Sequence, residues 1–428
     1  MTEQEIRDLG PAFATYLGGF RDCFLQKRTA AHFDTYCRGL LSDLPRKSVE
    51  PVALAAGTAV RTLQEFLITS AWDHGRARDH VQRRVADALA GVAADPAGTV
   101  GVIDETSCLK KGDQTPGVQR QYLGCAGKVD NGIVTVHVAV ARGRFKALLD
   151  ADLYLPQGWD ADRERCRAAG IPDEVRYQPK WKLALGQLAR LAANGVRFDW
   201  LTFDEGYGAA VPLLRVLNLG KQPFVAEVPT SFAVRSAAAG AARRADARLP
   251  THATGAWKRF RLARQTGPAQ VWRAKAVRVW AAGRWHRLIA AVNEATGEVK
   301  YFLTNALAGS LKRVLTVAFS RWHVEHVFRV AKSEAGLMHY EGRDYTGLVR
   351  HLVLGLVTLG FVAVQTERLR GEKLGPDAGA GVPGVERPVC GPVPPAAGDG
   401  HDPAHERGHP VSPAAERGGH QGAQETAA

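Results

Sequence analysis

The chain has 428 residues with 56 Lys and Arg against 43 Asp and Glu, a formal net charge of +13, and 45% of its residues are hydrophobic. This composition predicts a globular protein of two or three domains, and the excess positive charge favours nucleic acid or an acidic membrane surface as a partner. We expect no signal peptide, membrane span, zinc site or disulfide scaffold. The N-terminus is acidic, the best apolar stretch (His351–Gln365) is short, and the six cysteines form no C-x-x-C pair.

The first 95 residues are predicted to be helical, because apolar residues recur at three- and four-residue spacing. Basic residues are interleaved with these apolar positions throughout the segment. Residues 1–95 are therefore predicted to form a small basic helical domain that binds DNA. Solvated helix faces without any ligand remain an equally good interpretation of the same pattern.

From about Pro96 the pattern changes to short β-rich runs. Strands are predicted over Gly98–Asp104, Gly132–Arg142 and Phe198–Asp204, and an amphipathic helix over Lys180–Gly195. This alternation predicts an α/β fold with a mixed sheet.

The chain becomes β-rich again over residues 224–316, after which one long helix is predicted over Leu311–Gly336 and another over Leu348–Arg370. The last 54 residues, Gly375–Ala428, contain no Leu, Ile, Phe, Tyr or Trp and are rich in Pro and Gly. Such a segment buries too little apolar surface to offset the entropy of ordering, so we expect a disordered C-terminal tail.

Two aspartates stand at the ends of predicted core strands. Asp104 ends the first strand and Asp204 ends another, and each is followed by Glu and a small residue. Ligands of open α/β sheets bind at strand ends, so these carboxylates are candidate site residues. A helix cap or a turn is the alternative role for each of them alone. Because side chains alternate along a strand, Asp104 and Glu105 are expected to face opposite sides of the sheet.

A third carboxylate, Glu325, lies in the predicted helix at the margin of an apolar stripe. Arg321 precedes it by four residues and Lys332 follows it by seven, which stacks the three side chains along one side of the helix. An exposed ion pair of little energetic value is the alternative interpretation.

Together, two strand-end aspartates and a helical glutamate form a suitable ligand set for two Mg²⁺ ions, which prefer carboxylate oxygens. Two ions about 3.5–4 Å apart can activate a nucleophile and stabilise the leaving oxygen of a phosphodiester. Arg321 and Lys332 are then placed to bind phosphates. The pattern predicts a nuclease or a phosphoryl-transfer enzyme that acts on DNA or RNA.

Four segments resemble a bacterial insertion-sequence transposase of the DDE class: VIDET, KKGDQTPGVQRQYLGCAGKVDN, LTFDEGYG and RWHVEHVFRVAKSEAGLMHYEGR. The last one is similar to the Y-x2-R-x3-E-x6-K signature of cut-and-paste transposases with a β-rich insertion. Arg321, Glu325 and Lys332 match its R, E and K, while Ala318, with Phe319 beside it, stands at the tyrosine position. The resemblance extends from about residue 40 to residue 370.

The resemblance implies a ribonuclease-H-like catalytic core over residues 96–223 and 312–372, a β-rich insertion over 224–311 and a tail over 373–428. It implies that Asp104, Asp204 and Glu325 bind two Mg²⁺ ions, with Mn²⁺ as the alternative. In related enzymes the insertion holds the transposon end and stacks an aromatic ring on a displaced base. The candidates for that ring are Trp257, Trp272, Trp280 and Trp285, although a tryptophan in a β-rich segment is more often a core residue.

The segment Lys110–Lys128 is unusually polar for a connection between core strands. Its glycines can bring backbone amides and cations close to phosphates, although an ordinary basic hairpin is the alternative. The cations concerned are Lys110, Lys111, Arg120 and Lys128. The P-loop pattern is absent, so no nucleotide cofactor is expected.

The leading hypothesis is a cytoplasmic, nucleoid-associated transposase that binds terminal inverted repeats and target DNA, acts as a homodimer and cuts the element's ends. A hairpin intermediate is expected by analogy only. A stand-alone metal-dependent nuclease is the second hypothesis. A decayed transposase that binds DNA without cutting it is the third, suggested by the abrupt change of composition near Leu374.

Overall fold

The structure is a computed structural model that describes residues 3–373 apart from 253–254 and 263–267. Apart from Lys373, the tail predicted over 373–428 lies outside the described residues. The described part combines helices with one large mixed sheet, so the α/β class predicted from the sequence is confirmed.

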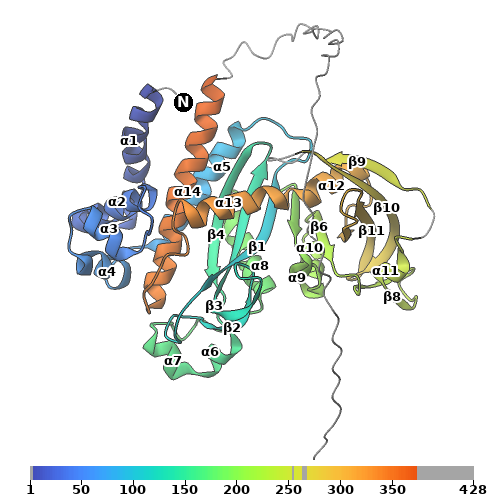
Figure 1. Ribbon diagram of the computed structural model, residues 1–428, viewed down its shortest axis with the longest axis horizontal. Coiled ribbons are helices and arrows are strands. Elements are labelled where there is room, and N and C mark those ends of the chain that lie inside the picture. Colours follow the sequence, from blue (N-terminus) through green and yellow to red (C-terminus); the bar gives the residue numbers. More distant parts are fainter. Residues whose placement is uncertain (1–2, 253–254, 263–267, 374–428) are drawn as a thin grey trace, which may run out of the picture. The chain divides into compact units, whose positions relative to one another are not determined.

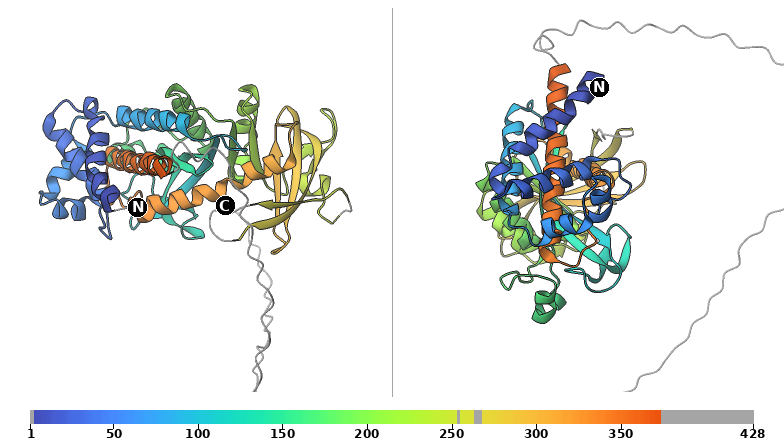
Figure 2. Two further views of the ribbon diagram at one scale, coloured as in Figure 1. Left: turned by 90° about the horizontal axis from the view of Figure 1, so that it is seen from above. Right: turned by 90° about the vertical axis from the view of Figure 1, so that its left-hand side faces the viewer.

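The first part of the chain folds into short helices whose apolar residues share a core with the last helix, α14 (Tyr345–Lys373). The helix α14 contacts α2, α4 and α5 on one side and strand β4 on another, and Figure 2 shows it between the N-terminal helices and the sheet. The N-terminal helices are α1 (Glu3–Gly18), η1 (Arg21–Cys23), α2 (Lys27–Leu41), α3 (Val49–Ala55), α4 (Val60–Ile68) and α5 (His74–Gly91).

Among the described residues the sheet has twelve strands, in the order β2-β3-β1-β5-β6-β12-β11-β10-β7-β8, with β4 paired to β3 and β9 to β10. Strands β1, β5 and β6 run parallel to one another. The first group of strands is β1 (Val100–Leu109), β2 (Gln119–Leu123), β3 (Lys128–Arg142), β4 (Phe145–Leu153), β5 (Trp200–Phe203) and β6 (Phe224–Val228). The second is β7 (Ala233–Arg235), β8 (Ala242–Arg244), β9 (Lys258–Leu262), β10 (Gln270–Ala281), β11 (Arg284–Asn293) and β12 (Val299–Thr304).

Helices between the strands cover the sheet, and Figure 1 shows α13 crossing over the strands of the first group. In chain order these helices are α6 (Gln157–Ala161), α7 (Arg163–Ala168), α8 (Lys180–Ala193), α9 (Glu205–Gly208), α10 (Val211–Leu219), α11 (Ala245–Arg248), α12 (Leu311–Phe319) and α13 (Arg321–Ser333). The prediction of one long helix over Leu311–Gly336 was wrong, because the helix is interrupted at Ser320. The hydroxyl and the amide of Ser320 both donate to the Val317 carbonyl, which replaces the regular helical pattern at that point.

The apolar stretch His351–Gln365, expected to be too short for a membrane span, is part of the longer helix α14. Its segment Tyr345–Gly371 is long and apolar enough to cross a membrane by length and composition alone. However, 83% of its most apolar window is buried inside the protein. A mostly buried helix of this kind is typical of a protein core.

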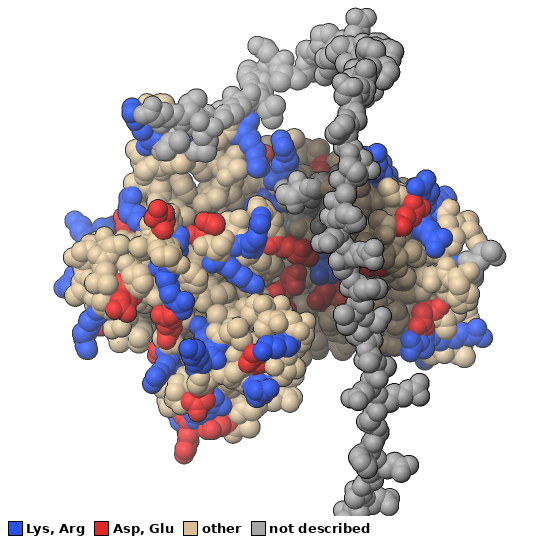
Figure 3. All heavy atoms as spheres, viewed as in Figure 1, with Lys and Arg blue, Asp and Glu red and all other residues tan. Residues whose placement is uncertain are grey.

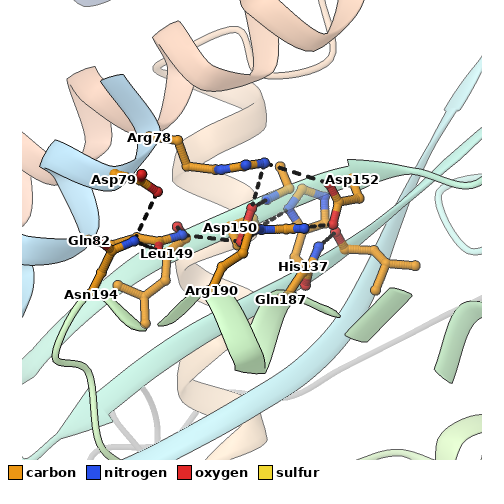
Figure 4. A network of polar contacts seen from close by, with 12 residues as sticks. Arg78, Asp79, Gln82, His137, Leu149, Asp150, Asp152, Gln187, Arg190 and Asn194 are labelled. Atoms are coloured by element: carbon orange, nitrogen blue, oxygen red, sulfur yellow. Dashed lines mark hydrogen bonds and ion pairs between the residues drawn. The ribbon is translucent and has the colours of Figure 1, made fainter. Parts of the chain in front are cut away.

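A buried polar network fastens helices α5 and α8 to strand β4 (Figure 4). The carboxylate of Asp150 is fully buried and accepts hydrogen bonds from Arg190 Nε at 2.9 Å and from Gln82 Nε2 at 3.1 Å. Asn194 donates to the Gln82 side-chain oxygen at 2.8 Å. The buried carboxylate of Asp150 and both polar atoms of the Gln82 side chain thus have partners, as burial requires.

Candidate active site

Three neighbouring parallel strands in the interior of the sheet bring acidic residues to the same level along the strands. Ile103 of β1 pairs with Phe203 of β5, and Phe203 pairs with Ala226 of β6. The residues that follow these on the three strands are Asp104, Asp204 and Glu227. In-register parallel strands therefore gather three carboxylates that are far apart in the sequence.

Local structure fixes the two aspartates. Asp204 is the N-cap of α9, and its Oδ1 accepts a hydrogen bond from the Tyr207 amide at 3.2 Å. Asp104 accepts from the Glu105 amide at 2.8 Å. The cap that sequence reasoning weighed as an alternative for Asp204 is thus present. It uses one carboxylate oxygen, which leaves the other lone pairs available to a ligand.

The pKa of Asp104 shows that its negative charge is poorly compensated. Burial raises this pKa from 3.8 to about 6, the nearby Arg321 opposes the shift, and the charge of Asp204 adds to it. A carboxylate in this position has no cation of its own close enough to restore its ordinary pKa.

The next residue on β1, Glu105, faces the other side of the sheet, in agreement with the expected alternation. Its carboxylate lies 2.7 Å from Lys180 Nζ at the start of α8. A cavity of about 310 Å³ on that side is lined by Glu105 and Asp204 together with Tyr154, Tyr177, Lys180, Trp181 and Tyr207. Asp204 is therefore accessible from this cavity.

Arg321 and Glu227 form a largely buried ion pair beside Asp104. Arg321 Nη1 lies 2.8 Å from Glu227 Oε2, and Lys300 Nζ lies 2.6 Å from Glu227 Oε1. The three side chains are 15–20% exposed. Sequence reasoning missed Glu227, and the only available signal was an acidic residue inside the otherwise apolar strand FVAEV.

The structure places Glu325 one helical turn after Arg321, on the same face of α13, and leaves it exposed. The ligand atoms of Asp104, Asp204 and Glu325 do not all lie within 4.8 Å of one another; in the described part of the chain that criterion is met only by Asp22, Cys23 and His80. This second trio is a poor metal site, because burial raises the pKa of the Cys23 thiol to about 12. The structure thus brings together Asp104, Asp204 and Arg321, with Glu325 beyond them.

The predicted phosphate-binding cations are distributed over two places. Lys110 and Lys111 line a cavity of about 690 Å³ with Arg46 and Cys108, and Lys332 of α13 acts electrostatically on Cys108. Cys108 is four residues after Asp104 on β1, a separation of roughly 13 Å. The ammonium group of Lys110 donates to the Tyr340 carbonyl, and its burial lowers its pKa.

The other two cations lie on the β2–β3 hairpin. Arg120 is exposed on β2. Lys128 lies 3.0 Å from Asp130 Oδ2, which offsets part of its charge. Arg120 is therefore the less compensated of the two cations. The hairpin lies at one end of the strand order, where β2 is the outer strand.

The four tryptophans of the β-rich part differ in burial. Trp272 is fully buried against Phe319 at a ring-centroid distance of 4.6 Å, so it is a core residue and not a candidate for base stacking. The Trp257 ring faces Lys275 Nζ at 4.6 Å. Trp280 and Trp285 are half-buried and meet edge to face at 5.6 Å.

The residues at the strand edge fit a divalent cation. Asp104 and Asp204 offer hard oxygen ligands on neighbouring strands, and a bound cation would stabilise the ionised form of Asp104 that burial disfavours. In the described part, Tyr207 Oη and Arg321 Nε are buried atoms near these carboxylates without a hydrogen-bond partner. Acidic side chains gather in a recess on the face shown in Figure 3, with basic side chains around it.

Comparison with known proteins agrees with this geometry. Residues 19–291 match the family described as DDE superfamily endonuclease. Over 210 residues the chain is 32% identical to the "Probable transposase for insertion sequence element IS701" of Microchaete diplosiphon. That alignment covers 48% of this chain and 51% of the relative, so the chain spans about half the length of the curated relative it matches. The family match includes Asp104 and Asp204 and ends before Glu325.

Proposed function

The chain belongs to the DDE superfamily endonuclease family, and from that premise we propose that it is a transposase that cuts and joins DNA at the ends of an insertion sequence. Its mixed α/β sheet is consistent with the ribonuclease-H-like fold of such enzymes. The observation that carries the proposal is the pair of aspartates, Asp104 and Asp204, that directly follow the parallel pairing of β1 with β5, where burial raises the pKa of Asp104.

In this proposal Asp104, Asp204 and Glu325 bind two Mg²⁺ ions, or Mn²⁺ in their place. The three carboxylates would not need to meet at one point to hold two ions, because each ion would take its own subset of them as ligands. Glu325 therefore serves as the ligand on the helix side, opposite the strand aspartates. When bound, Mg²⁺ supplies charge neutralisation and a nucleophilic water at neutral pH.

The side chains around the carboxylates position the DNA. Arg321 contacts a non-bridging oxygen of the scissile phosphate and offsets the negative charge that develops there. Water attacks phosphorus in line with the leaving group, the P–O3′ bond breaks, and the departing strand end takes up a proton as a free 3′-OH. That hydroxyl then attacks a phosphodiester of the target DNA in the same geometry. A new P–O3′ bond to the element's end forms, the target's own P–O3′ bond breaks, and the leaving 3′ oxygen of the target takes up the proton that the attacking hydroxyl loses.

The basic residues beyond the carboxylates hold the flanking DNA. Lys110, Lys111 and Lys332 gather around Cys108, roughly 13 Å along β1 from Asp104. Phosphates on one side of the cut lie along this path, while Arg120 and Lys128 contact the backbone further out. We assign end recognition to residues 1–95, the catalytic core to 96–223 and 312–372, and the β-rich insertion to 224–311. Two such chains act on the paired ends.

A stand-alone endonuclease is the second candidate, because the matched family is described by DNA cleavage and not by strand transfer. The two candidates share every residue of the site. They differ only in the second step, the attack of the freed 3′-OH on target DNA.

The test is cleavage of a supercoiled plasmid that carries the DNA flanking the coding sequence, with Mg²⁺ or with a chelator. Asp104→Asn, Asp204→Asn and Glu325→Gln are expected to lower the rate about 10²-fold or more while binding persists. Glu334→Gln is the matched control, since Glu334 is an exposed glutamate at the end of the same helix. A second plasmid as target reports joining.

Each outcome distinguishes the candidates. Metal-dependent cuts with joining support the transposase, and cuts without joining support the stand-alone endonuclease. Binding without cutting by the wild type identifies a decayed DNA-binding derivative. Full activity of Glu325→Gln would exclude Glu325 as the third carboxylate.

A further inference from the structure

Glu227 of β6 is placed to influence the active site although it is not one of the three proposed metal ligands. It follows Ala226 on β6, one strand away from β5, at the level of Asp204. Its carboxylate is 15% exposed and bridges two cations, Lys300 at 2.6 Å and Arg321 at 2.8 Å. Three secondary-structure elements, β6, β12 and α13, meet at this one side chain.

The bridge solves an electrostatic problem at the start of α13. Arg321 is the first residue of that helix, and a cation there is disfavoured by the positive end of the helix dipole. The first turn of α13 contains no acidic residue, and Ser320 provides no side-chain cap. Glu227 therefore supplies, from the sheet, the negative charge that the helix N-terminus lacks.

The same contact fixes the guanidinium group relative to the catalytic aspartates. Arg321 lies close enough to Asp104 to oppose the rise of its pKa, while its Nη1 is held by Glu227. Glu325 follows Arg321 by one helical turn. A shift of Arg321 would therefore move both the phosphate-binding cation and the third carboxylate.

We propose that Glu227 is a positioning residue that, through Arg321, sets the first turn of α13 and hence the placement of Glu325 relative to Asp104 and Asp204. This inference rests on the proposed function for its catalytic consequence. Lys300 and Arg321 each occupy one carboxylate oxygen of Glu227, so the proposal gives Glu227 a positioning role and not that of a metal ligand.

The first experiment is a double-mutant cycle on the plasmid cleavage rate with Glu227→Gln and Arg321→Gln. Glu227→Gln alone is expected to lower kcat about 10–100-fold with less than about a twofold change in KM, because positioning is lost while DNA contacts remain. In the Arg321→Gln background the same change is expected to have almost no further effect. Glu298→Gln, which removes the more exposed carboxylate 3.4 Å from Lys300, is the matched control and should keep full activity.

Three results would overturn the proposal. An equal loss of kcat from Glu227→Gln in both backgrounds would show that Glu227 does not act through Arg321. A rise of tenfold or more in the Mg²⁺ concentration for half-maximal rate would identify Glu227 as a metal ligand instead. Glu227→Asp, which keeps the charge, is expected to recover part of the rate, and no recovery would also count against positioning.

A second readout needs no activity and separates this proposal from the proposed function. Hydrogen exchange of the wild type and of Glu227→Gln is compared over residues 311–333 in chelator. The first turn of α13 is expected to exchange at least about fivefold faster in Glu227→Gln, while α8 and the Glu298→Gln control are unchanged. Unchanged exchange in α13 would refute the positioning role of Glu227 even if the protein cleaves DNA. Faster exchange would support that role even if the protein does not cleave DNA.

Discussion

Two pairs of aspartates lie on strands of the same sheet, and they differ in how their charge is matched. Asp150 and Asp152 of β4 are bracketed by two arginines. Arg190 Nε lies 2.9 Å from Asp150 and its Nη2 pairs with Asp152, while Arg78 lies 3.7 Å and 3.8 Å from the two carboxylates. Burial raises the pKa of Asp150, but both arginines oppose that shift.

Among the residues that the structure describes, Asp104 and Asp204 form no such ion pairs. Arg321 is the cation that acts on Asp104, and its guanidinium is already held by Glu227. Matched charges serve the fold, since the pairs in Figure 4 tie two helices to β4. Unmatched carboxylates at a strand edge instead leave room for cations from solution and for the phosphates they bind. Charge balance, and not the presence of acidic pairs, separates the structural cluster from the candidate active site.

The strongest effect on stability is expected from breaking the matched cluster. Asp150→Ala leaves Arg190 and Arg78 without their buried partner, so the free energy of unfolding should fall by about 3 kcal/mol. Urea unfolding in chelator measures this. Asp173→Ala is the control, because Asp173 is 66% exposed beside Arg163, and its loss should cost less than about 1 kcal/mol. Equal losses for both variants would show that the matched cluster has no special structural role.

A second prediction extends the comparison to His351, a buried group whose surroundings favour its neutral form and, among the described residues, contain no charged partner for the protonated form. His351 is fully buried between Tyr36 Oη and the Gly336 carbonyl, each 2.9 Å away, and burial lowers its pKa from 6.5 to about 4. The unfolded chain therefore binds a proton more readily, and stability is lost as the pH falls from about 6.5 towards 4.

The loss attributable to His351 at pH 4.5 is about 2 kcal/mol relative to pH 7.5. His351→Gln should be less stable at pH 7.5 but lose about 2 kcal/mol less on acidification, as measured by urea unfolding at both pH values. His252→Gln is the control, since His252 is exposed. If His351→Gln loses as much stability on acidification as the wild type, the burial of neutral His351 is not the cause of the acid sensitivity.

Sequence reasoning found Asp104 and Asp204 because their signal is local. Each follows a short apolar run, and β5 does end at Phe203, but β1 continues past Asp104 to Leu109, so the prediction that Asp104 ends its strand was wrong. The two aspartates still lie at the same level, because β1 and β5 pair in parallel up to Ile103 and Phe203. The mixed sheet and the helix α8 are likewise encoded in short patterns of apolar residues. These features need no knowledge of which distant segment lies alongside.

What the sequence did not reveal depends on distant partners. Glu227 is one polar residue in a strand, and its importance comes from Lys300 and Arg321, which lie 73 and 94 residues further along the chain. Strand β4 was not predicted because Asp150 and Asp152 interrupt its apolar pattern. Its burial depends on arginines supplied by two separate helices.

The last prediction inverts the first at the unmatched pair. Burial raises the pKa of Asp104 to about 6, so at pH 7.5 folding holds this carboxylate ionised against its preference. Asp104→Asn should then raise the free energy of unfolding in chelator by about 1–2 kcal/mol, less than the full shift implies because the half-buried side chain is partly screened by water. The gain should shrink as the pH is lowered from 6 towards 4, because the folded wild type takes up a proton on Asp104 over that range while the unfolded chain stays largely ionised until its ordinary pKa of 3.8. Urea unfolding across that range measures the gain, with Asp150→Asn as the matched variant that should lose stability. A destabilised Asp104→Asn would mean that the protein itself compensates the charge of the Asp104 carboxylate. The argument that this carboxylate is available to bind a metal ion would then fail.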